Sequence, residues 1–431
     1  MKYYENPSPD KWDEILRRPA KKTKELHEVV GKVLDDVRSN GDSALKKYEL
    51  QFDKVALEEL AVSEEEFTEA QACVSQELKD AIQIAHDNIY KFHAAQKFSP
   101  IRVETCMGIV CEQRAVPIEK VGLYIPGGTA PLFSTVLMLA VPAKIAGCSE
   151  IILCTPPDKD GKCNPAVLYS AKVSGVSKIY KVGGAQAIAA MAYGTESVPK
   201  VDKIFGPGNQ YVVAAKQLVS LEDVAIDMPA GPSEVEVIAD AESNPVFVAA
   251  DLLSQAEHGV DSQVVLVATD KNIIEAVNAE LVKQLLQLPR KEIAEKALQN
   301  SKVIYVPTDD MVVSLSNAYA PEHLVISTKN CDSIAEKITH AGSVFLGAFS
   351  CESAGDYASG TNHTLPTKGY AKAYSGLCLD SFMRKITFQR LSSEGVKSIG
   401  KAVELMAEAE GLDAHKNAMT VRLNYVNGLT E

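Results

Sequence analysis

Four of the eight histidines lie in short polar segments marked by glycine or proline, the kind of place where side chains do chemistry. These four are His258, His323, His363 and His415. Imidazole is a common metal ligand and the side chain most easily used as a base near neutral pH. The other histidines lie in charged, helix-like stretches and are predicted to be surface residues: His27, His86, His93 and His340.

Four residues are candidate metal ligands. Gln255 and His258 are three apart at the end of a predicted helix, so their side chains share one face. Asp356 lies in a loop of small residues, and His415 lies just inside a helix that Asp413 can cap, where the helix dipole keeps the ring neutral. Two imidazoles, a carboxylate and an amide oxygen fit zinc or manganese better than calcium. A capping cation is an alternative for His258.

A second candidate group is the pair Glu322 and His323, which opens a predicted strand after Pro321. A carboxylate beside an imidazole can hold its tautomer and tune its basicity, as a general base requires. A solvated polar strand start is an alternative on this evidence. Glu410 ends a predicted helix five residues before His415.

Glycine-bearing loops follow three of the predicted strands. They are Pro126–Pro131, Gly183–Gln186 and Gly206–Asn209. Each opens a helix, so backbone N–H groups and helix N-termini would face a phosphate-containing cofactor. None has the Gly-x-Gly-x-x-Gly spacing, and a single loop of this kind is more often an ordinary turn than a nucleotide site, so the prediction depends on the three together.

The elements that must position these residues alternate between short apolar runs and helix-length amphipathic stretches. One series runs from Val121 to Met228 and a second from Val235 to Leu346. Such alternation is typical of parallel sheets covered on both faces, and ligands bind beyond the carboxyl ends of their strands. The chain is therefore predicted to be α/β, with two doubly wound Rossmann-like units and helical N-terminal and C-terminal segments. Residues 103–116 alternate as a hairpin would.

Composition excludes several classes of protein. The 431 residues carry 44 basic and 57 acidic side chains, and the net charge of -13 argues against nucleic acid or an acidic membrane as a partner. The first residues lack the apolar core of a signal peptide, and the longest apolar run, Val136–Val141, is too short to span a bilayer. A cytoplasmic location is expected. Nine cysteines without a Cys-x-x-Cys pair predict free thiols, although spacing alone leaves a thiol nucleophile open.

Five long motifs resemble the histidinol dehydrogenase family, and the likeness runs from about Arg18 to Arg422. The motifs are VGLYIPGG at Val121–Gly128, FGPGN at Phe205–Asn209, DMPAGPSE at Asp227–Glu234, DLLSQAEHG at Asp251–Gly259 and GDYASGTNH at Gly355–His363. The resemblance implies NAD-dependent oxidation of L-histidinol through L-histidinal to L-histidine, using two NAD and one water.

The resemblance also implies a role for each candidate residue. It assigns one zinc per subunit to Gln255, His258, Asp356 and His415, the acid/base work to Glu322 and His323, and the NAD site to Tyr124, Gln186 and Asn209. Substrate would be positioned by Ser233, Glu410, His323 and the zinc-binding residues. Similar enzymes are homodimers in which Glu410 and His415 come from the partner subunit.

The resemblance and the strand pattern together predict four segments. They are an N-terminal helical segment at 1–25, a first Rossmann-like domain with the metal and acid/base residues at 26–117 and 234–376, an NAD-binding Rossmann-like domain at 118–233, and a C-terminal helical tail at 377–431.

Two other classes of function use the same residues. In a zinc hydrolase, Glu322 or Glu257 would activate metal-bound water, and the glycine loops would be idle. A non-catalytic binding protein for histidine-like ligands would need only the pocket.

Overall fold

The computed structural model describes residues 1–18, 23–127, 131–229 and 231–429. The chain forms two compact units. Unit 1 contains Met1–Gln96 and Ile118–Phe382, and unit 2 contains Lys97–Pro117 and Met383–Glu431.

Six parallel strands form sheet A of unit 1, in the order β1-β11-β10-β9-β12-β13. Their bounds are Lys2–Glu5 (β1), Lys302–Tyr305 (β11), Gln263–Ala268 (β10), Glu234–Ala239 (β9), His323–Ser327 (β12) and Ser343–Leu346 (β13). The central strands β9 and β10 are buried along their whole length, as expected of a parallel sheet covered on both faces.

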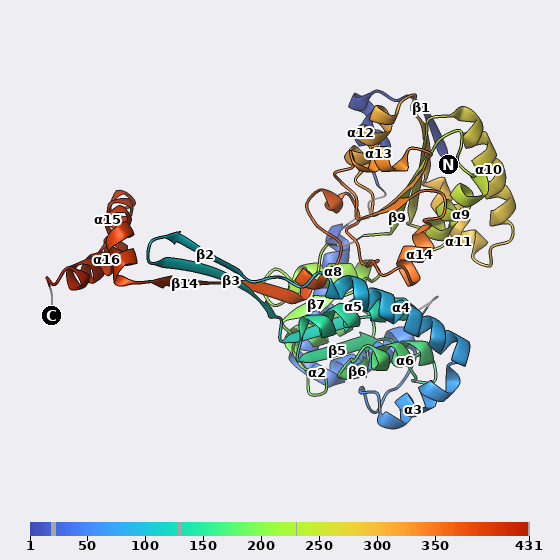
Figure 1. The fold of residues 1–431 in the computed structure, drawn as a ribbon. Helices are drawn as coiled ribbons and strands as arrows, with labels where there is room; N and C mark the ends of the chain where they lie inside the picture. Colours follow the sequence, from blue (N-terminus) through green and yellow to red (C-terminus); the bar gives the residue numbers. More distant parts are fainter. Residues whose placement is uncertain (19–22, 128–130, 230, 430–431) are drawn as a thin grey trace. The chain divides into compact units, whose positions relative to one another are not determined.

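Helices cover both faces of sheet A (Figure 1). One face carries α9 (Pro245–Ala256), α10 (Lys271–Leu285) and α11 (Lys291–Gln299), and the other carries α1 (Trp12–Ile15), α12 (Asp309–Tyr319) and α13 (Cys331–Ala335). Helix α9 begins where the side chain of Asn244 accepts a hydrogen bond from Val246 N–H and Pro245 takes the first helical position. Helix α14 (Glu352–Tyr357) follows β13.

Five parallel strands form sheet B of unit 1, in the order β6-β5-β4-β7-β8. Their bounds are Lys178–Lys181 (β6), Glu150–Thr155 (β5), Lys120–Tyr124 (β4), Lys203–Phe205 (β7) and Ala225–Ile226 (β8). One face packs on α2 (Thr23–Tyr48), α7 (Gly184–Tyr193) and α8 (Gln210–Val219). A second group of helices is centred on α5 (Phe133–Ala146), which packs on α4 (Gln76–Ala94) and α6 (Pro165–Val173). Helix α3 (Glu64–Cys73) packs on α6.

The two sheets have the same strand order, once β1 is set aside at the edge of sheet A. In each, the first strand lies between the second and the fourth, so the chain reverses direction across the sheet between β9 and β12 and between β4 and β7. The predicted fold class is therefore confirmed: two doubly wound parallel-sheet units with helical terminal segments.

Unit 2 is built on the antiparallel sheet C, in the order β14-β3-β2. The predicted hairpin is confirmed as β2 (Ile101–Cys106) and β3 (Ile109–Pro117). The segment expected to be a purely helical tail instead begins with strand β14 (Met383–Leu391), followed by α15 (Ser393–Ala409) and α16 (Asp413–Val426). Strand β14 has adjacent polar residues at both ends, Arg384-Lys385 and Gln389-Arg390, and it pairs with β3, which lies more than 250 residues earlier, so the local pattern marks it only weakly.

Two further segments differ from the sequence expectation. The N-terminal segment, expected to be helical, begins with β1, which adds to the edge of sheet A beside β11. Residues 26–117 were expected to belong with 234–376, but α2 packs on α7 and α8 of sheet B, and residues 97–117 belong to unit 2. The apolar spacing of a helix shows which of its faces is buried. It does not show which distant sheet or helix covers that face, so the partner of α2 could not be predicted from its own sequence.

One of the predicted surface histidines is buried. His93, on α4, has no exposed surface, and its Nδ1 lies 2.9 Å from the carbonyl oxygen of Ile89. Burial lowers the pKa of His93, so the neutral ring is favoured.

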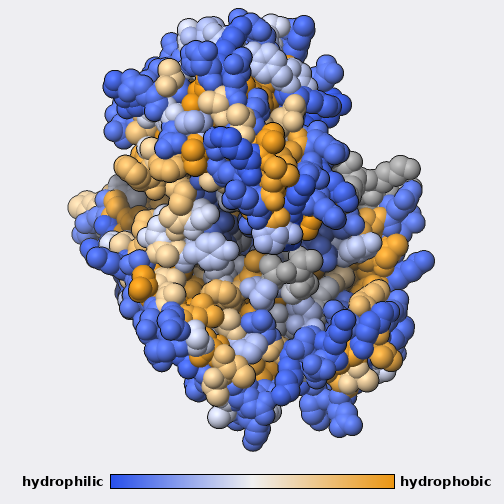
Figure 2. Space-filling model, turned by 90° about the vertical axis from the view of Figure 1, so that its right-hand side faces the viewer, coloured by the Kyte–Doolittle hydropathy of each residue, from blue (hydrophilic) through white to orange (hydrophobic). Residues whose placement is uncertain are grey.

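None of the described helices is both long enough and apolar enough to cross a membrane. The face shown in Figure 2 is mainly hydrophilic, with hydrophobic side chains in separate small groups.

Candidate functional site

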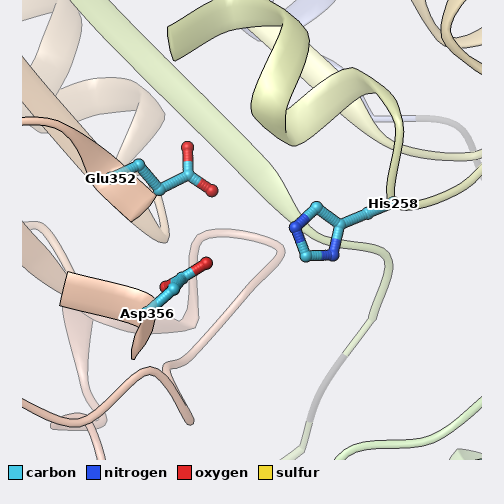
Figure 3. A group of neighbouring side chains, drawn as sticks. All are labelled: His258, Glu352 and Asp356. Carbon is cyan, nitrogen blue, oxygen red and sulfur yellow. The ribbon is translucent and has the colours of Figure 1, made fainter. Parts of the chain in front are cut away.

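Three side chains of unit 1 converge as a metal ligand set would. His258, Glu352 and Asp356 each offer one ligand atom, and these atoms all lie within 4.8 Å of one another. Figure 3 shows the His258 ring facing the two carboxylates. Imidazole and carboxylate donors at this separation suit a zinc or manganese ion.

Two helices position the group. His258 follows the last turn of α9, while Glu352 and Asp356 lie one turn apart on α14 and so share a face. Helix α14 packs on α9, and Gly355 permits a close approach to sheet A, because a Cβ atom there would lie 2.5 Å from the ring of Phe345. The small residues around Asp356 therefore allow α14 to pack closely against β13.

Gln255 lies in the last turn of α9, three residues before His258, and has no exposed surface. Neither its amide oxygen nor its amide nitrogen has a hydrogen-bond partner among the described residues. Leaving both groups buried and unpaired is costly, so this side chain fits a ligand to an ion better than a structural role. The structure thus brings His258 and Asp356 of the expected zinc set together with Glu352, and Gln255 stays a predicted ligand on the evidence of its unpaired amide.

The remaining two metal-site and substrate-site candidates belong to unit 2. Glu410 caps the C-terminus of α15, and His415 lies in the first turn of α16. Both are exposed. The expectation that Asp413 caps this helix is wrong, because Asp413 is its first residue and Leu412 occupies the cap position.

The acid/base candidates stand beside the metal group. Glu322 directly precedes β12, and its Oε2 accepts a hydrogen bond of 2.8 Å from the Glu234 N–H. His323 begins β12; its Nδ1 lies 3.8 Å from carboxylate oxygens of both Glu322 and Glu352, and its Nε2 lies 3.4 Å from Oδ1 of Asp356. All four side chains are mostly or fully buried.

Surplus negative charge surrounds the His323 ring. Burial opposes its protonation, but the carboxylates of Glu352, Glu322 and Asp356 outweigh this and raise the pKa of His323 to about 10. Burial raises the pKa of Glu322 to about 8 and that of Glu352 well above its usual range. Three acids around one imidazole leave a deficit of positive charge that a divalent cation would offset.

The edge of the sheet that carries this group differs from the expectation. His323 lies at the amino end of its strand, as does Glu234, while His258 precedes β10. The group therefore lies at the amino ends of the strands of sheet A, whereas ligands of open parallel sheets usually bind at the carboxyl ends. Ser233 lies at this same edge, and its carbonyl oxygen accepts a hydrogen bond from Gln263 N–H.

Two residues of the site were not assigned from the sequence. Glu352 is 1% exposed and lies four residues before Asp356, so helical spacing could have suggested it. His363 was noted as a candidate without a role. Its Nδ1 lies 2.8 Å from the carbonyl oxygen of Asp356 and its Nε2 lies 3.0 Å from Oγ1 of Thr135 on α5.

The three predicted cofactor-binding residues lie at the carboxyl ends of strands in sheet B. Tyr124 ends β4, Asn209 precedes α8 after β7, and Gln186 lies in the first turn of α7 after β6. Tyr124 and Asn209 thus flank the point where the strand order reverses, the usual place for a nucleotide. Gly206, between β7 and Asn209, lies close to the backbone of Tyr124. A Cβ atom at Gly206 would lie 2.1 Å from the carbonyl oxygen of Tyr124, so a larger residue does not fit there.

Several backbone amides of the glycine loops are already engaged. The N–H of Gly183 donates to Glu49, that of Gly184 donates to the hydroxyl of Tyr124, and that of Gly206 donates to Asp227. Asn209 accepts bonds from Tyr211 and Val212 N–H. The expected row of amides offered to a phosphate is therefore not formed at these positions.

All nine cysteines are free thiols. Burial raises the pKa of Cys148 to about 11 and that of Cys163 to about 12, which favours the unreactive thiol form.

Comparison with known proteins follows this geometry. A family model described as histidinol dehydrogenase matches residues 16–423. The histidinol dehydrogenase of Bacteroides thetaiotaomicron is 64% identical over 424 residues, which cover 98% of this chain and 99% of that protein. The Campylobacter jejuni enzyme is 52% identical over 423 residues, covering 97% of this chain and 98% of that protein.

Solved structures agree. The crystal structure of histidinol dehydrogenase from Elizabethkingia anophelis matches with a TM-score of 0.97 and 56% sequence identity, covering 99% of each chain. With a family model spanning nearly the whole sequence and relatives of this similarity, the chain belongs to the histidinol dehydrogenase family, oxidoreductases of histidine biosynthesis.

Proposed function

We propose that this protein oxidises L-histidinol to L-histidine in two NAD-dependent steps, with L-histidinal as the intermediate. The observation that carries the proposal is the buried imidazole of His323, set among three carboxylates beside a convergent ligand group. The family supplies the substrate class, and the residues of unit 1 supply groups suited to each step.

In the first step His323 accepts the hydroxyl proton of the substrate. An alcohol releases a hydride readily only as that proton leaves, so a base must lie at the alcohol oxygen. A divalent cation held by Asp356 would cancel part of the charge around His323 and favour the neutral ring that a base needs. Burial of the pair keeps bulk water from competing for the proton.

In the second step the aldehyde must first add water, and Glu322 is the group proposed to take the proton from that water. Burial raises the pKa of Glu322 to about 8, a value suited to proton exchange near neutral pH. Its bond to the Glu234 N–H fixes one carboxylate oxygen and leaves the other for this work. As the water adds, the protonated His323 returns its proton to the aldehyde oxygen, and the neutral ring then accepts the hydroxyl proton of the hydrate as it did that of the alcohol.

When bound, zinc supplies a positive centre that orients the imidazole and amino nitrogens of the substrate, and NAD supplies the hydride acceptor for both oxidations. Gln255, His258 and Asp356 are proposed as zinc ligands in unit 1, with His415 completing the set. Ser233 and Glu410 are proposed to position the substrate. Tyr124, Gln186 and Asn209 are proposed to line the NAD site, because all three lie at the carboxyl edge of sheet B, Tyr124 and Asn209 at its reversal point and Gln186 after β6.

We also propose that the protein is a homodimer in which Glu410 and His415 serve the site of the other subunit. Unit 2 supports this proposal, because sheet C and its two helices leave many large apolar side chains exposed. They include Ile101, Val103, Ile386, Phe388, Leu405, Met406, Val421 and Tyr425. A small unit with so little core needs a covering surface, and a second copy of the chain supplies one with matching symmetry.

The test is the stoichiometry of the reaction. Purified protein loaded with zinc is mixed with limiting L-histidinol and excess NAD, and reduced nicotinamide is followed by its absorbance. Two NADH per histidinol and L-histidine as product are expected. One NADH per substrate would contradict the two-step reaction, and none would favour a hydrolase or a non-catalytic binding protein.

A further inference from the structure

We propose that Glu49 is a positioning residue for the dinucleotide, which acts by fixing the amide of Gln186 so that its oxygen is presented as a hydrogen-bond acceptor. The inference rests on the proposed NAD site. It assigns the contact made by Gln186 to a donor group of the cofactor, either a ribose hydroxyl or the nicotinamide amide, and not to a phosphate.

The geometry begins at the end of α2. Here the helix widens into the π-helical turn η2 (Glu49–Asp53), which directs Glu49 inward, and the residue has no exposed surface. Its Oε1 accepts a hydrogen bond of 3.1 Å from Gly183 N–H and one of 2.9 Å from Nε2 of Gln186. π-Helical turns of this kind are often found at functional sites.

The chemistry of the pair sets the direction of the Gln186 amide. The amide nitrogen of Gln186 donates to Oε1 of Glu49, an oxygen that also accepts from Gly183 N–H, so the amide oxygen faces away from Glu49. That oxygen is turned toward Gly184, where a Cβ atom would lie 2.7 Å from it. Gln186 is 1% exposed and cannot reorient without breaking the bond. A cofactor group that reaches this oxygen must therefore donate.

The surroundings of the loop exclude the alternative of a phosphate contact. Gly183 and Gly184, which begin α7, give their N–H groups to Glu49 and to the Tyr124 hydroxyl. The buried carboxyl group beneath the loop also adds negative potential whenever it is ionised, and an anion is disfavoured beside it. Burial raises the pKa of Glu49, so placing it here costs stability, which a purely structural role would not require.

The chain contains a matched control one short segment earlier, near the C-terminal end of α2. Asp42, on α2, accepts hydrogen bonds from Oγ1 of Thr195 and from the N–H of Ser197, just beyond the C-terminus of α7. Asp42 and Glu49 therefore both tie the α2 segment to α7, but only Glu49 contacts a residue of the proposed NAD site.

The experiment is a double-substitution cycle in the full-length, zinc-loaded protein. The variants are Glu49→Ala, Gln186→Ala, the two combined, Glu49→Gln and the control Asp42→Ala. NAD affinity is measured by titration calorimetry, KM for NAD by steady-state kinetics, and folding by thermal denaturation.

The expected result is non-additive. Glu49→Ala and Gln186→Ala should each weaken NAD binding by about 10-fold, the scale of one lost hydrogen bond, and the combined variant should be no weaker than the worse single one. Glu49→Gln keeps an acceptor oxygen and should stay within about 3-fold of the wild type. Asp42→Ala should leave NAD affinity unchanged, and histidinol affinity should be unchanged in every variant.

Additive losses in the combined variant, or an equal loss in Asp42→Ala, would overturn the proposal, because either result makes Glu49 only a general brace for α7. If Glu49→Ala does not fold, Gln186→Glu replaces it. That variant sets two acceptors face to face, and its loss of NAD affinity should be relieved by Glu49→Gln, whose amide can donate; no relief would also overturn the proposal. Failure of the wild type to bind or reduce NAD would refute the proposed function itself.

Discussion

His323 carries the most demanding role at the scale of single residues. Its imidazole is 4% exposed and its neighbours are carboxylates, so its surroundings both bury it and favour its charge. Asparagine has a similar polar shape but cannot exchange a proton in this pH range. The substitution therefore separates proton transfer from binding.

We expect His323→Asn to lower kcat by roughly 10²- to 10⁴-fold, the usual contribution of a general base. Affinity for NAD and zinc content should be retained, since the proposed ligands and NAD-site residues are unchanged. Steady-state kinetics with calorimetry of NAD binding will measure both. Turnover equal to that of the wild type would remove His323 from the mechanism.

His258 is expected to act through the metal. Removing one imidazole from a set of three or four donors should weaken zinc retention by about 100-fold or more. The measurement is the zinc content of His258→Ala after gel filtration against a mild chelator. His340→Ala is the matched control because His340 lies outside the group, and equal zinc retention in the two variants would count against the site.

Much of this site could be predicted from the sequence, and the limits have physical reasons. Gln255 and His258 are three residues apart, and Glu322 and His323 are neighbours, so local spacing was sufficient to group them, although α9 ends before His258. Glu352 was missed because what marks it as a site residue is its buried contact with His323, which lies almost 30 residues away along the chain. The surroundings of Gln186 were missed for the same reason, since Glu49 precedes it by 137 residues.

At the scale of elements, strand β9 lowers the stability of the fold at neutral pH, because it buries the ionisable side chain of Glu236 completely in the centre of sheet A. Burial raises the pKa of Glu236 from an ordinary value of 4.5 to about 8. The folded state therefore favours the protonated acid. Stability from this group is fully present below about pH 4.5 and is lost as the pH rises toward 8.

Replacing Glu236 by glutamine should remove this loss. Between about pH 5 and pH 8, the free energy of unfolding of Glu236→Gln should rise relative to the wild type by roughly 3 to 5 kcal/mol. Chemical denaturation at several pH values will measure the difference. Glu292→Gln, at an exposed position on α11, is the control, and a pH-independent difference for Glu236→Gln would show that the group does not titrate as stated.

Elements with a strong local pattern were predicted well. The two series of apolar runs predicted for Val121–Met228 and Val235–Leu346 coincide with sheets B and A, and the hairpin is β2 and β3, because central strands buried on both faces and a tight turn leave a clear sequence signal. Strands β1 and β14 lie at sheet edges, and their residues are largely exposed. Edge strands need fewer apolar residues, so their sequences resemble loops.

The whole molecule raises the question of how unit 2 contributes to the site. Glu410 and His415 are exposed on unit 2, and the remaining proposed ligands belong to unit 1. In a symmetric dimer each site would contain one set from each subunit. A mixture of two inactive variants can therefore test the sharing directly.

We expect His258→Ala and His415→Ala each to be inactive alone and to regain activity when unfolded together and refolded. Half of the dimers would then be mixed, and each would hold one intact site, giving about a quarter of wild-type activity. If each site were formed within a single chain, the mixed dimers would hold no intact site and the mixture would stay inactive. Sedimentation analysis of the refolded mixture will establish that dimers have formed.

The placement of the ligand group has a consequence for the metal-free state. The donors of unit 1 come from two short stretches, the end of α9 with the residues just after it, and α14. An ion held there would link these two helix segments, and none of the proposed ligands of unit 1 lies within a strand. Loss of the ion should therefore loosen one helix junction while the strands keep their order, so the protein can be emptied and refilled without passing through the unfolded chain.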